Sequence, residues 1–400
     1  MMLKRLNKIV GCEPVVLCLL LLAWTSSSVA VDSVARDYVI RDYMVAVNRP
    51  NNLHFIDLHT ETIVRTCKLP SSVAPGTVVM SPDKLTAYVL GGRFDRIFGV
   101  KINNCDLVFD ASFTSGNERI KSIASLAVSP DGEEIYTVHN PVRIMNDHYQ
   151  VMDPRFVAYR AKDGVGAKPA KSFYVPRQIN IMATGHDGRV YLSGPDVYVI
   201  DPDSGALAVA IASRTSQRKG YGQPDILTVW PVGSVNNEFV RMYTVAKYTD
   251  GTANPETTEW KWGFERVDLA TGKTEVKDFS DLEEVYFTGM HRPGHPDEFY
   301  QVLTQLKRNS VSKQQGIKKV DLDRTYYCIN FSTDGSKIYL GGTYNDIAIY
   351  DAETLTKLSN LVLPGGDMSM ATPQVFSLPV DKVVYSPQGD AYGSNLTASK

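Results

Sequence analysis

The chain repeats one pattern of apolar and polar positions along most of its length. A short apolar strand leads into a turn rich in Pro, Asp and Gly, and a second apolar strand follows. The pattern occurs at residues 78–92, 126–138, 181–194 and 329–342. These turn residues suit a tight reversal, because Pro presets φ, Asp accepts hydrogen bonds from nearby backbone N–H groups, and Gly adopts positive φ. Each occurrence therefore predicts an antiparallel hairpin.

A second pattern follows the first. It is a strand that ends near an Asp, a short turn of the Thr/Ser-Gly type, and a further strand, as at residues 53–69, 197–211, 264–279 and 347–363. Joined together, the two patterns give a four-stranded antiparallel meander of about 40–50 residues, which is typical of a β-propeller blade. We name the four strands a, b, c and d in chain order, with strand a nearest the propeller axis.

The series contains seven such units. They span residues 43–70, 77–114, 123–175, 178–212, 225–279, 284–323 and 326–363. The first unit lacks a strand a, and residues 370–378 form a strand with no blade of their own, so this strand fits the vacant place. The sequence therefore predicts an all-β, seven-bladed β-propeller over residues 37–379, with its ring closed by N- and C-terminal strands, which removes a free edge. Six or eight blades are the alternatives.

The N-terminal residues read as a secretory signal peptide. Lys4, Arg5 and Lys8 precede an apolar run at residues 15–24, which is short for a membrane span, and small residues lead up to Ala30. We expect cleavage near Ala30, a periplasmic location and no membrane span after processing. An uncleaved anchor is the alternative for residues 1–30. Residues 380–400 are expected to form a flexible C-terminal tail.

Charge and cysteine content exclude several classes of function. Removing residues 1–30, with their three basic residues and one acidic residue, changes the net charge from −2 to −4, which disfavours nucleic acid as a partner. The mature chain keeps Cys67, Cys105 and Cys328. Cys67 and Cys105 are candidates for a disulfide in an oxidising compartment, or are simply buried as small residues. No CxxC or CxxCH occurs, so neither covalent c-type haem nor a thiolate zinc site is expected on this chain.

Irregular segments gather on one face of the predicted propeller. Blade topology places the b–c and d–a connections on one face, and the a–b and c–d connections on the other. The irregular stretches at residues 140–154, 176–178, 221–225, 248–262 and 323–327 are all b–c or d–a connections. Loops tend to carry function while strands hold them in place. We therefore expect one group of residues to meet near one mouth of the axial channel, either as interface or pocket-wall residues or as braces between blades: Arg143, Arg177, Gln178, Gln223, Asp225, Tyr326 and Tyr327.

Motifs for catalysis on this chain are missing from the sequence. There is no Gly-x-Ser-x-Gly elbow, phosphate-binding loop or dinucleotide fingerprint. His291, His295, Asp297 and Glu298 lie close together in sequence, but on an a–b turn of the opposite face, so no metal site is expected. Trp260 and Trp262 alternate with Lys261, and we expect them to anchor a loop against a partner or its own blade.

Several segments together resemble a known family. They are NPVR (140–143), PRQIN (176–180), YGQPDILTVW (221–230), YYCINFSTDGSKIYLGG (326–342) and YDAETL (350–355). In this order they resemble the β subunit of quinohaemoprotein amine dehydrogenase, over essentially the whole mature chain. The SPDG and YDAET phrases are generic to bacterial propellers, whereas PRQI, QPDILTVW and YYCINFSTDG are specific. Cys328 and the run NRPNN (48–52) are less typical of the family.

The resemblance implies a periplasmic αβγ enzyme that oxidises primary amines to aldehydes and releases ammonia. In that family a small γ subunit carries cysteine tryptophylquinone, and the α subunit carries two c-type haems and passes electrons to a soluble acceptor. The β subunit would be a propeller without a cofactor or catalytic residue of its own, which docks γ and helps to wall the substrate pocket. The alternative is a stand-alone secreted propeller that acts as a binding or scaffold protein without enzymatic activity.

Overall fold

A computed structural model describes residues 39–71, 75–227, 235–368 and 371–385 of the chain. These residues form thirty strands and two short 3-10 turns, η1 (Ala161–Asp163) and η2 (Val380–Lys382). The predicted signal peptide lies outside them. Within the described ranges, no helix has the length and apolar character needed to cross a bilayer.

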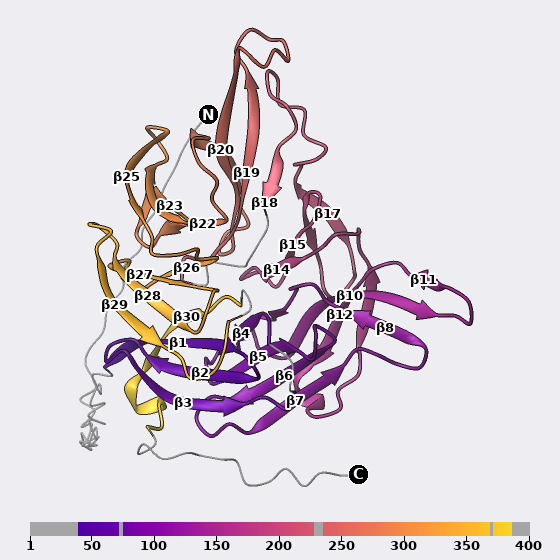
Figure 1. The fold of residues 1–400 in the computed structure, drawn as a ribbon. Helices are drawn as coiled ribbons and strands as arrows, with labels where there is room; N and C mark the ends of the chain where they lie inside the picture. Colours follow the sequence, from indigo (N-terminus) through magenta and orange to yellow (C-terminus); the bar gives the residue numbers. More distant parts are fainter. Residues whose placement is uncertain (1–38, 72–74, 228–234, 369–370, 386–400) are drawn as a thin grey trace, which may run out of the picture. The chain divides into compact units, whose positions relative to one another are not determined.

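The strands form seven antiparallel sheets, one for each predicted blade (Figure 1). Blade 1 contains β30 (Gln374–Pro379), β1 (Ile40–Asn48), β2 (Asn52–Asp57) and β3 (Thr62–Lys68). Blade 2 contains β4 (Val78–Met80), β5 (Thr86–Gly91), β6 (Arg96–Lys101) and β7 (Leu107–Ser112). Blade 3 contains β9 (Ala127–Val128), β10 (Glu134–Ile144), β12 (Arg155–Arg160) and β13 (Lys171–Tyr174), with β8 (Glu118–Lys121) and β11 (Tyr149–Val151) added to β10.

The other four blades follow the same order of strands. Blade 4 contains β14 (Ile181–Thr184), β15 (Val190–Ser193), β16 (Val197–Ile200) and β17 (Leu207–Ile211). Blade 5 contains β18 (Asp225–Leu227), β19 (Glu238–Tyr248), β20 (Thr258–Asp268) and β21 (Thr274–Asp281). Blade 6 contains β22 (Thr288–Arg292), β23 (His295–Val302), β24 (Gln305–Ser310) and β25 (Gln315–Asp321). Blade 7 contains β26 (Cys328–Phe331), β27 (Lys337–Gly341), β28 (Asp346–Asp351) and β29 (Lys357–Val362). The seven-bladed prediction is confirmed.

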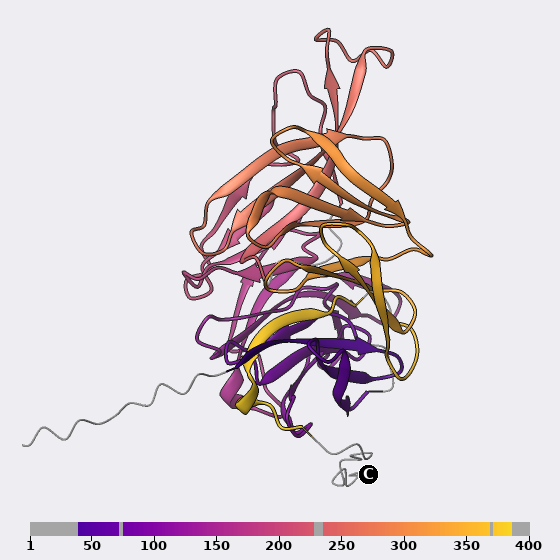
Figure 2. The ribbon, with the colours of Figure 1, turned by 90° about the vertical axis from the view of Figure 1, so that its left-hand side faces the viewer.

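The ring closes through strands from the two ends of the chain. β30 pairs antiparallel with β1, from Gln374 opposite Val45 to Pro379 opposite Ile40, and the two strands lie side by side in Figures 1 and 2. Phe376 on β30 packs against Tyr43 and Phe55, with ring centroids 6.5 and 6.4 Å away. The last strand of the propeller is therefore strand a of the first blade, as the sequence predicts.

The recurring a–b turns share one polar arrangement. In the turn that begins at Ser81, the Ser81 hydroxyl donates to the Asp83 carboxylate, which accepts from the Leu85 N–H at 3.0 Å. The same pattern repeats at Ser129 with Asp131 and at Ser332 with Asp334. The hydrogen bond from Ser129 is the main reason that the pKa of Asp131 lies below its usual range. Each hairpin is thus set by side-chain chemistry local to its turn.

A buried arginine joins blades 4 and 5. Arg241 on β19 is almost fully buried, and its Nε donates to Glu265 on β20 at 2.5 Å. Its Nη1 also donates to the Gly194 carbonyl of blade 4 at 2.7 Å, and its Nη2 bonds to the Ser213 hydroxyl. A buried charge is tolerated only when it is paired and hydrogen-bonded, so this guanidinium fixes the contact between the two blades.

Blades 1 and 2 are joined covalently. Cys67 on β3 and Cys105 in the turn between β6 and β7 form a disulfide with their Cα atoms 5.3 Å apart. Cys328 lies outside this disulfide and is buried, as expected of a core residue, and its Sγ donates to the Ala371 carbonyl at 3.6 Å. Beyond the closing strand, residues 380–385 of the predicted tail pack against these same two blades, and the rest of that tail lies outside the described residues.

We expect Phe376→Ala to lower the free energy of unfolding by about 3 kcal/mol or more, because it removes a buried ring from the closing strand. Leu358→Ala, at an exposed position of β29, is the matched control and should stay within about 0.5 kcal/mol of the wild-type value. Urea denaturation of the two variants measures the difference. Equal stability of both variants would mean that packing of β30 does not hold the ring.

Candidate functional site

One end of each blade carries the irregular connections of the chain. We call this set of b–c and d–a connections the loop face. Its members include residues 113–126, 140–154, 175–180, 212–224, 248–257, 282–287 and 322–327. Each of the seven residues singled out in the sequence lies in one of these connections or at the strand end next to it.

At the loop face, blade 3 carries two strands in addition to its usual four. The sequence predicts an irregular insertion at residues 140–154, but the structure shows a three-stranded extension there. The outer part of β10 pairs with β8 on one side and with β11 on the other (Figure 1). The partner strand β8 comes from the preceding d–a connection, so its pairing is long-range and local sequence patterns do not reveal it.

Arg143 belongs to this extension. Its Nη2 lies 2.9 Å from Oε1 of Glu118 on β8, and Arg155 approaches the second oxygen of the same carboxylate at 3.4 Å. The hydrogen bond from Arg143 is the largest cause of the lowered pKa of Glu118, with Arg155 adding to it. Arg143 therefore braces the extension, and only part of its guanidinium remains open to a partner.

Arg177 and Gln178 form the connection from blade 3 to blade 4. Arg177 is 55% exposed and forms an ion pair with the exposed Asp153 at 3.0 Å. Gln178 is exposed and has φ of +69°, a conformation that residues other than Gly rarely adopt. The next residue, Ile179, is fully buried. The chain thus turns sharply at Gln178 from a polar surface into an apolar inner strand.

Gln223 and Asp225 stand at the base of a second projection. β19 and β20 are eleven residues each, and their outer halves pair beyond the neighbouring strands. The connection before β18 runs along this hairpin, with the Gly222 N–H donating to the Ala246 carbonyl at 2.9 Å. Gln223 donates to the Arg214 carbonyl at 2.6 Å, whereas Asp225 is exposed at the start of β18.

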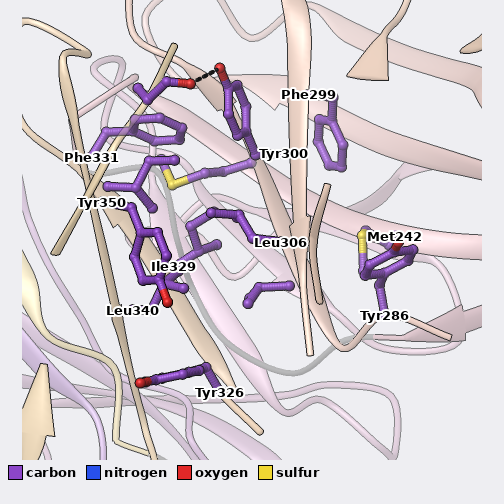
Figure 3. Close-up of a cluster of buried hydrophobic side chains, with 14 of the residues drawn as sticks. Met242, Tyr286, Phe299, Tyr300, Leu306, Tyr326, Ile329, Phe331, Leu340 and Tyr350 are labelled. Atoms are coloured by element: carbon purple, nitrogen blue, oxygen red, sulfur yellow. Dashed lines mark hydrogen bonds between the residues drawn. The ribbon is translucent and has the colours of Figure 1, made fainter. Parts of the chain in front are cut away.

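Tyr326 and Tyr327 are neighbours with different environments. Tyr326 is fully buried within an apolar cluster of blades 5 to 7 (Figure 3), and its hydroxyl donates to Asp323 at 2.9 Å. Burial, followed by the bond to Asp323, raises its pKa. Tyr327 is half-buried, and its ring lies 4.5 Å from that of Phe287. Tyr327 alone presents a ring at the surface, so Tyr326 supports the site from within the core.

The seven residues share a face without forming one contacting cluster. Among the contacts that the structure gives for described residues, no hydrogen bond, ion pair or ring contact joins any two of them. Their nearest partners are instead neighbours within the same or the adjoining blade. The expectation that they meet at one mouth of the channel therefore stays a prediction.

Exposed aromatic side chains add a signal that the sequence analysis did not use. Of the described aromatic residues classed as exposed, all but Tyr385 lie on the loop face: Phe94, Tyr149, Tyr174, Trp260 and Tyr344. Trp260 is 52% exposed, whereas Trp262 is buried and donates to the Glu284 carbonyl at 2.9 Å. Trp262 therefore anchors the connection from blade 5 to blade 6, and the exposed ring of Trp260 can contact a partner. Aromatic residues are enriched in protein–protein interfaces.

The histidines and carboxylates of residues 291–298 serve structural contacts. His291 bonds to the buried Glu238 at 2.9 Å, and Glu298 accepts from Arg308 at 2.6 Å. Burial alone would raise the pKa of Glu238, but His291 and Arg266 outweigh it and lower that pKa to about 2. Across the described ranges, no group of three His, Cys, Asp or Glu side chains is arranged to hold a metal ion.

A shallow cavity opens on the loop face at blade 7. Its volume is about 400 Å³, and its lining includes Asp323, Arg324, Tyr344 and Asp346. The Arg324 guanidinium lies over the rings of Tyr326 and Tyr344, at 4.4 and 5.1 Å from their centroids. A larger cavity of about 550 Å³ lies on the opposite face, beside His295. In the larger cavity the Ser310 hydroxyl donates to Asp297 at 2.7 Å, and the same carboxylate accepts from the Ser312 N–H, so this contact fixes the turn after β24.

Comparisons with known proteins support the fold. No family model matches the chain, and no curated protein matches its sequence. A functionally unknown protein from Desulfotomaculum acetoxidans is 12% identical, with a TM-score of 0.51 over 84% of this chain and 98% of its own. The chain is a seven-bladed β-propeller.

Two further solved structures are more distant in shape. The dihydro-heme d1 dehydrogenase NirN is 14% identical, with a TM-score of 0.46 over 84% of this chain and 75% of that one. Hydrazine synthase of Kuenenia stuttgartiensis is 11% identical, with a TM-score of 0.49 over 78% and 90%. At these identities the likeness concerns the propeller fold and carries nothing about activity.

We expect Glu118→Gln to loosen the blade 3 extension at pH 7, because it removes the charge shared by Arg143 and Arg155. Hydrogen exchange of residues 140–151 should accelerate by no more than about fivefold, as expected of a partly exposed ion pair. The pKa of Glu118 is lowered in the folded state, so its contribution is complete above the unfolded pKa and disappears as the pH falls through the folded one. The two proteins should therefore converge in acid. Asp147→Asn, on the same extension, is the control expected to show no change at pH 7.

Proposed function

We propose that the chain is the β subunit of a periplasmic quinohaemoprotein amine dehydrogenase. The αβγ enzyme would convert primary amines to aldehyde and ammonia, and this chain would dock the quinone-bearing γ subunit and help to wall the substrate pocket. The observation that carries the proposal is the order and position of three specific segments. Residues 176–180, 221–230 and 326–342 each lead through a d–a connection into the inner strand of a blade, so all three begin on the loop face; residues 228–230 lie outside the described ranges.

The chemistry of the loop face supports a docking role. It combines exposed rings, such as Tyr174 and Trp260, with ion pairs such as that of Arg177 with Asp153. Large rings bury much apolar area at low entropic cost, while polar groups at a rim fix orientation. The closed ring beneath holds these groups on rigid strands, which suits a surface that positions another protein.

In the proposed complex, the quinone of the γ subunit would supply the oxidising chemistry, and the two haems of the α subunit would carry electrons to a soluble acceptor. This chain would contribute position and exclusion of water. Tyr327, held by Phe287, and the apolar rings around it would lower the local dielectric at a pocket wall. Charges at the reacting group interact more strongly in such a dry site.

Purification of the tagged chain from its native host tests the proposal directly. We expect the chain to elute with a dihaem cytochrome and a small quinone-bearing protein, detectable by haem absorbance and quinone staining, and with primary-amine dehydrogenase activity. A chain that elutes alone, with neither partner, would favour the stand-alone binding or scaffold protein.

We expect Trp260→Ala and Arg177→Ala to weaken assembly of this complex, each by roughly 1–3 kcal/mol if its side chain contacts a partner. Lys162→Ala, at an exposed position of η1 on the opposite face, is the matched control and should assemble like the wild type. Titration of the purified variants with the partner subunits measures the loss. Unchanged affinity for both variants would place the docking surface elsewhere.

A further inference from the structure

The described part of the C-terminal tail bridges two blades. We call residues 380–385 the C-terminal segment. On blade 2, Asn103 bonds to it twice: its side-chain N–H donates to the Lys382 carbonyl at 2.9 Å, and its side-chain oxygen accepts from the Val384 N–H at 3.2 Å. Asn103, a single residue of the turn between β6 and β7, thus bonds to two residues of the segment, Lys382 and Val384.

Blade 1 holds the other end of the segment. The Tyr385 hydroxyl donates to the buried Asp57 at 2.6 Å and lies 3.0 Å from the Tyr43 hydroxyl. Arg65 on β3 donates to the Val384 carbonyl at 3.3 Å. The segment therefore stays bound only while its attachment points on blade 1 and blade 2 keep their spacing.

The disulfide fixes this spacing. Cys67 is two residues from Arg65, so both side chains point to the same face of β3. Cys105 is two residues from Asn103 and lies in the same turn. Each half of the disulfide is thus the close neighbour of a residue that holds the segment.

Apolar packing joins the disulfide and the segment as well. Val383 is only 7% exposed and belongs to the same apolar cluster as Cys67, and Cys105 packs against this cluster from its edge. Cys105 is partly exposed, whereas Cys67 is buried. Cys105 is therefore the more exposed half of the disulfide.

We propose that the disulfide and the C-terminal segment form a redox-dependent clasp, in which a dithiol reductant that cleaves Cys67–Cys105 releases the segment from blades 1 and 2. A thiolate of the dithiol attacks the Cys105 sulfur, the S–S bond breaks, and Cys67 leaves as a thiolate and takes up a proton. The second thiol of the reductant then displaces Cys105, which is protonated in turn. The protein gains two electrons and two protons, and the reductant becomes a cyclic disulfide.

Release follows from the loss of the crosslink. Once the two sulfurs separate, the covalent link between the turn that carries Asn103 and blade 1 is lost, and the packing of Cys105 against the apolar cluster remains. The attachment points on blade 1 and blade 2 can then move apart, and the hydrogen bonds that hold the segment break. The inference does not depend on the proposed amine dehydrogenase function, because it concerns this chain alone.

Hydrogen exchange of the full mature chain tests the clasp, with dithiothreitol as the reductant and alkylation to verify that both thiols have formed. We expect residues 380–385 to exchange about tenfold faster or more in the reduced protein, as expected of a local opening. Strands β26 and β27 of blade 7 should exchange at the same rates in the reduced protein as in the oxidised protein. Unchanged exchange of the segment after verified reduction, or an equal acceleration in blade 7, would overturn the proposal.

Further variants test whether the disulfide and the C-terminal segment are coupled through the turn that carries Asn103. Asn103→Ala should speed exchange of the segment while the disulfide stays intact, whereas Asn104→Ala, whose side chain bonds within its own turn, should not. The double variant Cys67→Ser/Cys105→Ser should show fast exchange of the segment without reductant and no response to it. If Asn103→Ala behaves like Asn104→Ala, the segment is not held through this turn and the clasp is wrong.

Discussion

Closure of the ring is the constraint on which the rest of the structure depends. Each blade buries its apolar faces only against its two neighbours, so an open ring would leave both faces at one junction exposed to water. The pairing of β30 with β1 solves this within a single sheet, and Phe376 fills the space between Tyr43 and Phe55. The disulfide and residues 380–385 tie the same blade to blade 2. Because the ring is closed, its blades can carry long, polar connections without separating from one another.

The repeating part of the fold was predictable because its information is local. A Ser that bonds to an Asp two residues later sets the a–b hairpins at Ser81, Ser129 and Ser332, and the recurring pairs of apolar strands along the chain give the count of blades. The closing strand was predictable by subtraction, since blade 1 lacked one strand and residues 370–378 were left over. The blade 3 extension was not predictable in this way. Its strand β8 pairs with β10 across another connection, and no turn chemistry links the two.

The sequence predicts where the residues of the candidate site lie, but only partly what each of them does. Blade topology puts Arg177, Gln178 and Asp225 at the loop face, and they are exposed there. The identical neighbours Tyr326 and Tyr327 both precede β26 in the connection from blade 6, but Tyr326 packs into the apolar cluster of blades 5 to 7 whereas Tyr327 is half-buried against Phe287. Trp260 and Trp262 are two residues apart on β20, and they differ because Trp260 lies in the outer part of the strand, which pairs only with β19, whereas Trp262 also pairs with β21. Residue type alone does not separate a core ring from a surface ring, and the exposed rings of Tyr149 and Tyr174 required the three-dimensional arrangement.

The closing pair also has a consequence for the order of folding. A chain made from its N-terminus contains β1 early and β30 only near the end, so blade 1 stays one strand short until nearly the whole propeller has been made. The Val380 N–H then bonds to the Val39 carbonyl, which brings the start and the end of the propeller to one place. Until that moment β1 presents an unpaired edge to its surroundings. Completion of the ring is therefore the last step in building the propeller, and a chain truncated before Gln374 would keep that edge open.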